Sequence, residues 1–263
     1  MAFEYLKNVP LERAKNEYLE LLVSQGFKWK TQRVSVQQAC GRITAEAVYA
    51  HICAPHYAAS AMDGVALDAK LSFGATESTP VTLMEKDYVV VDTGDPIPEH
   101  CDAVIMVEDI VRNADGSITI HAPAAPWQHI RQIGEDVCAG EMILPAYVPV
   151  TPASIGAMIA AGVLELTVIK KPVVGIIPSG DEIIQPCSDP KPGDILEFNS
   201  SIFSAMLGGW GAECVTYPIV PDVFEEIKTA VKTAADECDI VILNAGSSAG
   251  RGDFSAQAIG ELG

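Results

Sequence analysis

The chain has 263 residues, of which 49% are hydrophobic, and its 35 Asp and Glu outnumber 17 Lys and Arg, for a formal net charge of −18. The apolar content excludes an intrinsically disordered chain, and the length is enough for about two domains. The acidity argues against binding to nucleic acid or to an anionic membrane surface, because both are bound by clustered Lys and Arg.

Cysteine usage and the N-terminus indicate a cytoplasmic protein. The seven cysteines are widely spaced and include no CxxC pair, which is typical of reduced thiols. The N-terminus carries no apolar signal segment. The most apolar stretch, Ala153 to Leu164, is too short to span a bilayer, so we expect a buried helix there.

The first half of the chain predicts a helix followed by short strands. Apolar residues recur at helical spacing between Pro10 and Gly26, which predicts a helix bounded by these two residues. A second, short helix capped by Ser35 is expected to follow. From about 51 to 129, short alternating runs separated by turns such as Asn-Ala-Asp-Gly predict a small barrel or sandwich.

The second half predicts alternating helices and strands. A helix is expected between Pro152 and Gly162. Three Val/Ile-rich strands and two helices then alternate, with the strands at 172–178, 213–220 and 239–246 and the helices at 199–210 and 222–236. Such nearly continuous apolar strands are typical of a parallel sheet covered on both faces. This order predicts a doubly wound α/β unit with right-handed crossovers.

Polar residues follow all three of these strands. The first strand is followed by Ser179, Gly180, Asp181 and Glu182, and the second by Asp222. The third is followed by a Gly-Ser run at 246–252 and then by Asp253. The carboxyl ends of parallel strands meet at one edge, where open α/β sheets bind ligands. One such loop alone would be interpreted as a turn or cap. Three together predict a phosphate or oxyanion site in which Mg²⁺ offsets the carboxylates.

Other clusters are interpreted as loops or turns from their composition. His51, Cys53 and His56 could suggest a soft-metal site, but no fourth ligand is signalled nearby, so a loop is favoured. The segments at 59–64 and 92–98 are interpreted as turns.

Seven motifs occur in order along the chain. They are SAMDG at 60–64, DTGDPIPEHCDAVIMVED at 92–109, IRQIGED at 130–136, PSGDEI at 178–183, FNS at 198–200, PD at 221–222 and GSSAGRGD at 246–253. Together they resemble the molybdopterin molybdotransferase family, the MoeA-type enzymes, whose animal relative is the E domain of gephyrin. The resemblance covers essentially the whole chain.

The resemblance implies an α/β multidomain protein that forms an elongated homodimer. Residues 1–50 and 130–170 would form a discontinuous, helical and mixed dimerisation or linker domain. Residues 51–129 would form an inserted β-barrel-like domain. Residues 171–263 would form a doubly wound α/β molybdopterin-binding domain. The family continues through the rest of that domain and a further β domain, so we expect this chain to be C-terminally truncated relative to the family.

The implied activity is Mg²⁺-dependent insertion of molybdate into adenylylated molybdopterin with release of AMP, followed by handover of the cofactor to molybdoenzymes or their chaperones. The motifs place catalytic residues at Asp63, Thr93, Glu182, Asp222 and Asp253. Asp222 and Asp253 would hold Mg²⁺, Glu182 would lie beside molybdate or the attacking group, and Asp63 and Thr93 would complete the site across the dimer. The substrate-binding positions would be Ser179, Gly180, Asp181, Asn199, Gly246, Ser248 and Gly250. The last three would cradle a phosphate.

Two other functions are weighed against this one. The chain could be a catalytically incomplete dimerisation and binding module, as in a gephyrin-like scaffold, and an enzymatic assay distinguishes the two. A molybdopterin adenylyltransferase, which shares the α/β domain, is disfavoured because SAMDG and the inserted β region belong to the insertion enzymes.

Overall fold

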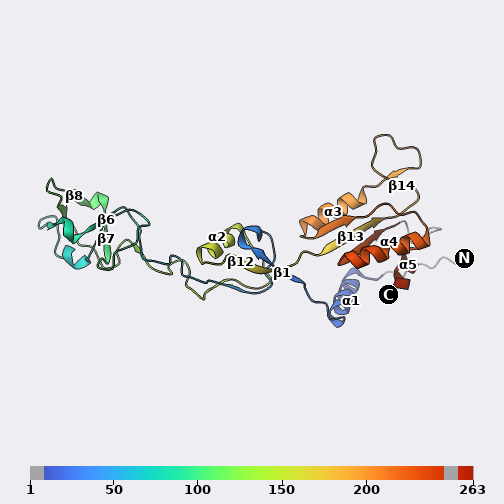
Figure 1. Ribbon diagram of the computed structural model, residues 1–263, viewed down its shortest axis with the longest axis horizontal. Coiled ribbons are helices and arrows are strands. Elements are labelled where there is room, and N and C mark those ends of the chain that lie inside the picture. Colours follow the sequence, from blue (N-terminus) through green and yellow to red (C-terminus); the bar gives the residue numbers. More distant parts are fainter. Residues whose placement is uncertain (1–8, 246–253, 263) are drawn as a thin grey trace. The chain divides into compact units, whose positions relative to one another are not determined.

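The chain divides into two compact units in the computed structural model, which describes residues 9–245 and 254–262. One unit contains the described residues up to Gln32 and from Ile169 onward, and the other contains residues 33–168. Figure 1 shows the elements of both. Among the described residues, no helix has the length and apolarity that crossing a membrane requires.

A three-stranded parallel sheet lies at the centre of the first unit. Its order is β16-β13-β17, formed by β16 (Glu213–Thr216), β13 (Val173–Pro178) and β17 (Ile240–Asn244). Ile176 pairs with Thr216 on one side and with Ile242 on the other. Ile176 and Ile177, whose side chains alternate between the two faces, are both fully buried. The central strand is therefore covered on both faces, as its apolar sequence predicts.

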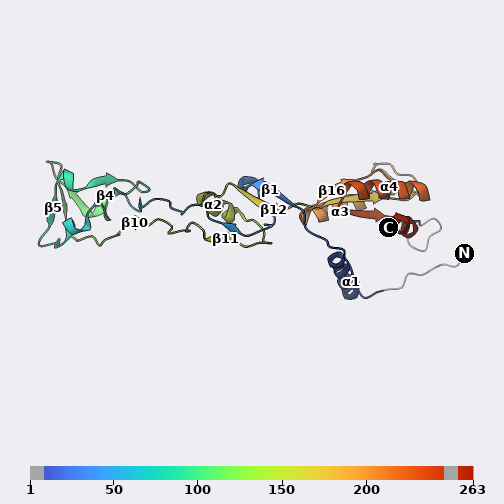
Figure 2. The ribbon, with the colours of Figure 1, turned by 60° about the horizontal axis from the view of Figure 1, so that its bottom comes forward.

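Helices cover the two faces of this sheet. They are α3 (Asn199–Gly209), α4 (Phe224–Glu237) and α5 (Ser255–Leu262). Figures 1 and 2 show α3 and α4 on opposite faces, which right-handed crossovers produce when the chain passes first to one neighbour of β13 and then to the other. Ile227, Val231 and Ala234 of α4 pack in one core with Ile177. The predicted alternation of strands and helices is confirmed.

The N-terminal segment adds a helix to this unit. The helix α1 (Leu11–Ser24) begins directly after Pro10 and ends before Gly26, whose φ of 72° is a left-handed value that favours glycine. The predicted bounds are confirmed. Past the helix, Lys30 Nζ pairs with Asp239 Oδ1 at 2.6 Å, before β17. A small parallel ribbon of β14 (Ile183–Ile184) and β15 (Ile195–Leu196) follows the central strand.

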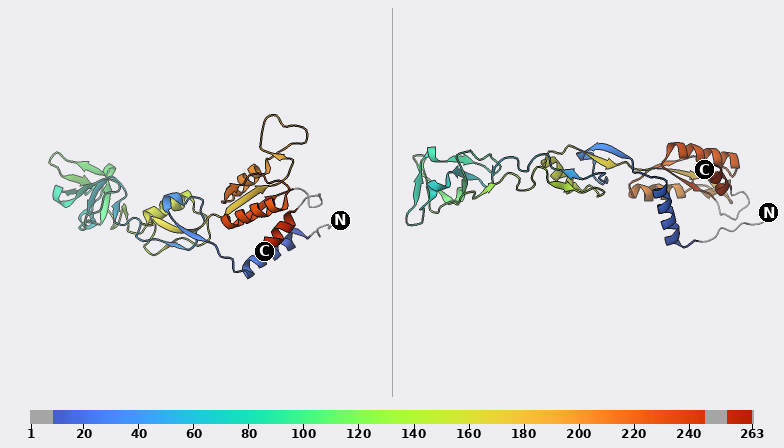
Figure 3. Two further views of the ribbon diagram at one scale, coloured as in Figure 1. Left: turned by 45° about the vertical axis from the view of Figure 1, so that its right-hand side comes forward. Right: turned by 90° about the horizontal axis from the view of Figure 1, so that it is seen from below.

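The β-rich part of the second unit consists of two three-stranded antiparallel sheets, coloured cyan to green in Figure 3. One sheet contains β6 (Val89–Val91), β4 (Gly64–Leu67) and β7 (Ala103–Met106); the other contains β5 (Val81–Leu83), β9 (Ile118–Ile120) and β8 (Ile110–Arg112). Val65 and Leu67 of the first sheet share a core with Ile118 and Ile120 of the second.

These pairings correct the expectation of a barrel-like domain. Within the described residues, each outer strand pairs on one side only, so the two sheets do not join into a closed barrel. The predicted turn Asn-Ala-Asp-Gly does connect β8 and β9, and the Gly116 N–H donates to the Asn113 carbonyl at 3.2 Å.

The rest of the second unit combines one helix with two-stranded ribbons. The helix α2 (Pro152–Ala160) is capped by Thr151, whose hydroxyl accepts from the Ser154 N–H. The ribbons are β1 (Thr31–Ser35) with β12 (Glu165–Ile169), β2 (Val48–Tyr49) with β11 (Met142–Leu144), and β3 (Ala59–Ser60) with β10 (Ile130–Arg131). Short 3-10 turns lie at Val36–Gln38, Ala69–Ser72, Glu85–Asp87 and Val107–Asp109.

The prediction of a helix capped by Ser35 is wrong in two respects. The segment is a single 3-10 turn, and the Ser35 side chain makes no capping hydrogen bond. The reason is packing: Val36 and Ala39 are both fully buried in the core that contains Met158, so this segment follows the core surface rather than extending as a helix.

Candidate functional site

The end of β13 is joined to both neighbouring chain segments. Ser179, the residue after the strand, pairs in parallel with Val220, and its N–H donates to the Asn244 carbonyl at 2.9 Å. Ser179 is only 3% exposed. The predicted meeting of strand ends at one sheet edge is therefore present for the two tips that the structure describes.

Hydrogen bonds connect the first tip to the second. The Ser179 hydroxyl donates to Asp222 Oδ1 at 3.2 Å, and the Asp222 backbone N–H donates to Asp181 Oδ1 at 3.1 Å. The carboxylate of Asp222 is thus oriented by Ser179 while its backbone is held by Asp181. We call Ser179, Gly180, Asp181, Glu182 and Asp222 the strand-tip group.

Gly180 lets the chain turn at this edge. Its φ is 153°, and its N–H donates to the Val220 carbonyl at 3.1 Å. A Cβ on this residue would lie 2.7 Å from Ile183 Cγ1 and 3.2 Å from Glu182 Oε2. The position therefore excludes a side chain, and the Glu182 carboxylate lies against the glycine. Five sequence-predicted residues are brought together in this way.

Asn199 and the residues of the third tip are not joined to this group by any contact that the described residues show. Asn199 is the first residue of α3, where the Glu197 side chain accepts from the Ser200 N–H at 2.9 Å. Among the described residues, no hydrogen bond joins Asn199 to the strand-tip group. Gly246, Ser248, Gly250 and Asp253 lie outside the described residues. The phosphate cradle and the second carboxylate of the predicted Mg²⁺ pair therefore stay predictions.

The strand-tip group has the donor chemistry that Mg²⁺ uses. Asp181 and Asp222 present hard carboxylate oxygens on adjacent segments, joined by the hydrogen bond from Asp222. Mg²⁺ commonly binds one or two carboxylates and completes its shell with water and substrate phosphates. Within residues 9–245 and 254–262, no group of three His, Cys, Asp or Glu is arranged around one metal position. Asp181 and Asp222 are therefore carboxylates of the kind that bind Mg²⁺.

A second predicted pair comes together in the unit of residues 33–168. The Thr93 backbone N–H and hydroxyl both donate to Asp63 Oδ1, at 2.7 and 2.8 Å. The backbone donor first, and the hydroxyl second, lower the pKa of the Asp63 carboxyl below its ordinary value. Asp63 is therefore held as an exposed, ionised carboxylate.

Strand register explains this contact. Asp63 immediately precedes β4, Thr93 is the second residue after β6, and Gly64 pairs with Val91 across the two strands. Composition alone indicated only turns at both segments. The motif resemblance was the signal that identified them.

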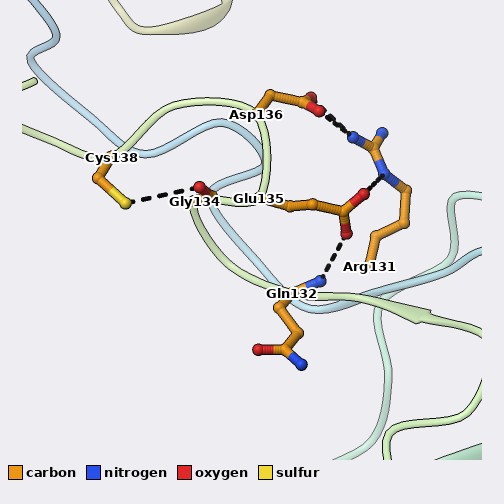
Figure 4. Close-up of polar contacts among 6 residues, drawn as sticks. All are labelled: Arg131, Gln132, Gly134, Glu135, Asp136 and Cys138. Carbon is orange, nitrogen blue, oxygen red and sulfur yellow. Dashed lines mark hydrogen bonds and ion pairs between the residues drawn. The ribbon is translucent and has the colours of Figure 1, made fainter. Parts of the chain in front are cut away.

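The IRQIGED motif forms a loop in which Arg131 pairs with acidic residues of the same loop, as drawn in Figure 4. Arg131 Nη2 contacts both oxygens of Asp136 at 2.6 and 2.7 Å, and Arg131 Nε lies 3.4 Å from Glu135 Oε1. The Gln132 N–H donates to the other Glu135 oxygen at 3.2 Å. The Asp136 carboxylate, followed by Glu135, raises the pKa of the Arg131 guanidinium. This arginine is neutralised within its own loop.

The residues weighed as a soft-metal cluster have other neighbours. His51 Nδ1 lies 3.2 Å from the Gly162 carbonyl oxygen. The His56 ring packs edge-on against the Tyr57 ring, with centroids 4.9 Å apart. Cys53 accepts a hydrogen bond from the Ala139 N–H at 3.4 Å. The three side chains are therefore engaged separately.

Known proteins match almost the whole chain. Residues 9–162 match the MoeA N-terminal region (domain I and II), and residues 175–263 match a probable molybdopterin binding domain. A molybdopterin molybdenumtransferase of Haemophilus influenzae is 31% identical over 264 residues, which cover 96% of this chain and 65% of that protein. Molybdopterin molybdenumtransferase 2 of Mycobacterium tuberculosis is 32% identical over 243 residues, covering 86% of this chain and 60% of that protein.

A solved structure matches the fold as well. A molybdopterin biosynthesis MoeA protein from Pyrococcus horikoshii superposes with a TM-score of 0.81 at 29% identity, covering 98% of this chain and 67% of that one. The chain spans 65% and 60% of the length of the two curated relatives. Because the match to the MoeA N-terminal region covers more than half of the sequence, the chain belongs to the MoeA family.

Proposed function

We propose that this chain acts as a molybdopterin molybdotransferase, which inserts molybdate into adenylylated molybdopterin with Mg²⁺ and releases AMP. The observation that carries the proposal is the hydrogen-bonded strand-tip group, in which Ser179 and Asp181 hold Asp222 at the ligand-binding edge of a parallel sheet. Curated relatives named molybdopterin molybdenumtransferase support the reaction class. The product would pass to molybdoenzymes or their chaperones.

The strand-tip group would act by positioning and charge. Asp222 together with Asp253 would hold Mg²⁺ against the pyrophosphate of the adenylylated substrate. When bound, Mg²⁺ would neutralise the phosphate charge that the carboxylates otherwise repel. Ser179 would orient the Asp222 carboxylate, and Glu182 would lie beside molybdate or the attacking group. Asn199, Gly246, Ser248 and Gly250 would complete the contacts to the substrate.

Asp63 and Thr93 would complete the site from a second copy of the chain in a homodimer. Both Thr93 donors converge on Asp63 Oδ1, so Oδ2 is the oxygen that would accept from the ligand. Because the pKa of Asp63 is lowered, this oxygen stays anionic at neutral pH. It would then bind a group that donates hydrogen bonds, such as the pterin ring, rather than an oxyanion.

Isothermal titration with adenylylated molybdopterin, with and without Mg²⁺, tests the proposal. We expect Mg²⁺-dependent binding that is much weaker, but still measurable, in Asp222→Asn and unchanged in Asp189→Asn, which replaces an exposed acid of the same unit. Release of AMP on adding molybdate would then be measured. Binding without AMP release would favour the dimerisation and binding module, and full Mg²⁺-dependent turnover by Asp222→Asn would refute the metal role.

A further inference from the structure

Two cysteines far apart in the sequence lie opposite each other in the unit of residues 33–168. Ala54 and Val137 form an antiparallel bridge and exchange both backbone hydrogen bonds, at 2.9 and 3.2 Å. The next pair in this register is Cys53 with Cys138. In an antiparallel ladder the pair after a hydrogen-bonded one is the close pair, with Cα atoms about 4.5 Å apart.

The two sulfurs converge on one point. A Cβ built on Gly134 would lie 2.8 Å from Cys138 Sγ and 3.6 Å from Cys53 Sγ, so the sulfurs are separated by at most the sum of these two distances. Cys138 is exposed and Cys53 is half-buried, and both are free thiols. A disulfide needs Cβ atoms about 3.8 Å apart and sulfurs about 2 Å apart, which side-chain rotation can reach from a close antiparallel pair.

The loop drawn in Figure 4 holds this arrangement in place. Gly134 has a φ of 77°, donates its N–H to the Pro55 carbonyl at 2.9 Å, and accepts from Cys138 Sγ at 3.5 Å. Arg131 fastens the same loop through Asp136. The absence of a side chain at Gly134 thus leaves the space that the two sulfurs share.

We propose that Cys53 and Cys138 form a redox-active dithiol that closes reversibly to an intramolecular disulfide. The oxidant would be a low-molecular-weight disulfide. The thiolate of exposed Cys138 attacks one sulfur of that disulfide and releases one small thiol, which leaves a mixed disulfide on Cys138. The Cys53 thiolate then attacks Cys138 Sγ and releases the second small thiol. The protein loses two electrons and two protons, and the small disulfide gains them.

The bond would tie together the chain segments that lead into and out of the β-rich part. The closed ring would contain both three-stranded sheets and the Asp63–Thr93 pair. Cross-linking a ring of this length lowers the entropy of the unfolded chain, so the oxidised form should unfold at a higher temperature. This device is independent of the proposed reaction, because neither cysteine belongs to the strand-tip group or contacts Asp63.

Oxidised glutathione is the probe that tests it. The reduced full chain would be equilibrated in buffers of increasing oxidised-to-reduced glutathione ratio, its remaining thiols blocked with N-ethylmaleimide, and its peptides mapped by mass spectrometry. We expect a Cys53–Cys138 cross-linked peptide that forms at a lower ratio than glutathionylation of exposed Cys187, reverses with dithiothreitol, and accompanies a higher Tm.

Single variants separate the dithiol from general thiol reactivity. Cys53→Ser should trap the glutathione adduct on Cys138, and Cys138→Ser should abolish the cross-link. Cys187→Ser, in the other unit, should leave it unchanged. Wild-type chain that carries separate glutathione adducts on Cys53 and Cys138, or that stays reduced at both while Cys187 is modified, would overturn the proposal.

Discussion

Ser179→Ala is the sharpest test of how the strand-tip group works. The substitution removes one hydroxyl from a buried position and leaves Asp222 without the donor that orients its carboxylate at 3.2 Å. Hydrogen bonds to charged groups contribute about 1.5–3 kcal/mol. The bond is long and Asp222 is partly exposed, so we expect the lower end, about 1.5 kcal/mol, or roughly a tenfold weaker Kd for Mg²⁺-dependent binding of adenylylated molybdopterin.

Isothermal titration would measure this Kd, with Ser188→Ala as a matched control because Ser188 is an exposed serine of the same unit. A double-mutant cycle gives the mechanism: in an Asp222→Asn background, Ser179→Ala should cause little further loss, since its effect acts through Asp222. An unchanged Kd in Ser179→Ala, or an equal loss with and without the Asp222 carboxylate, would refute the reasoning.

Three further predictions concern stability and ionisation. Ile177 is fully buried against α4, so Ile177→Ala should lower the free energy of unfolding by about 2–5 kcal/mol in urea denaturation followed by circular dichroism, and Ile240→Ala, at a half-exposed position of the same sheet, by less. Thr93→Val removes the hydroxyl donor but keeps the larger, backbone donor, so the pKa of Asp63 should rise only part of the way to its ordinary value of 3.8 in an NMR titration. Thr151→Ala removes the cap of α2 and should cost about 1 kcal/mol in the same urea denaturation.

The lowered pKa of Asp63 fixes the sign of its pH dependence. Its stabilising contribution is complete above the unfolded pKa and is lost as the pH falls through the lower folded pKa, below 3.8. If the pKa of Asp63 in Thr93→Val rose all the way to its ordinary value, the backbone N–H of Thr93 would not be the larger cause of the lowered pKa. Equal losses at Ile177 and Ile240 would contradict the burial argument, and unchanged stability in Thr151→Ala would contradict the capping role.

Regular patterning made much of the architecture predictable. The helix between Pro10 and Gly26, the helix after Thr151 and the strand-helix alternation from 171 onward are all present, because helical spacing and continuous Val/Ile runs are local signals. The helix after Thr151 is not the buried helix that was expected, since Met158 is its one buried residue. The strand-tip group could be predicted too. Parallel strands place their carboxyl ends at one edge whatever the details of packing, so residues following successive strands must meet.

Contacts set by strand pairing between residues far apart in the sequence could not be predicted from local residue patterns. Asp63 and Thr93 are 30 residues apart, and only the register of β4 on β6 brings them into contact. Their composition indicated turns, and motif resemblance alone identified them. For the same reason the short alternating strands left a barrel and a sandwich open, since they specify a buried face but not which edges pair. The structure has two separate sheets that share one core.

Cys53 and Cys138 show most clearly the difference between what the local sequence predicts and what the tertiary structure decides. Each residue alone is one of seven scattered thiols, and their spacing led to the interpretation of isolated reduced cysteines. The register through Ala54 and Val137 places them opposite each other, and Gly134 leaves room for both sulfurs. Local residue patterns determine which segments become helices and strands. The positions at which distant segments meet depend on strand register and on packing around small residues, and these are properties of the folded chain as a whole.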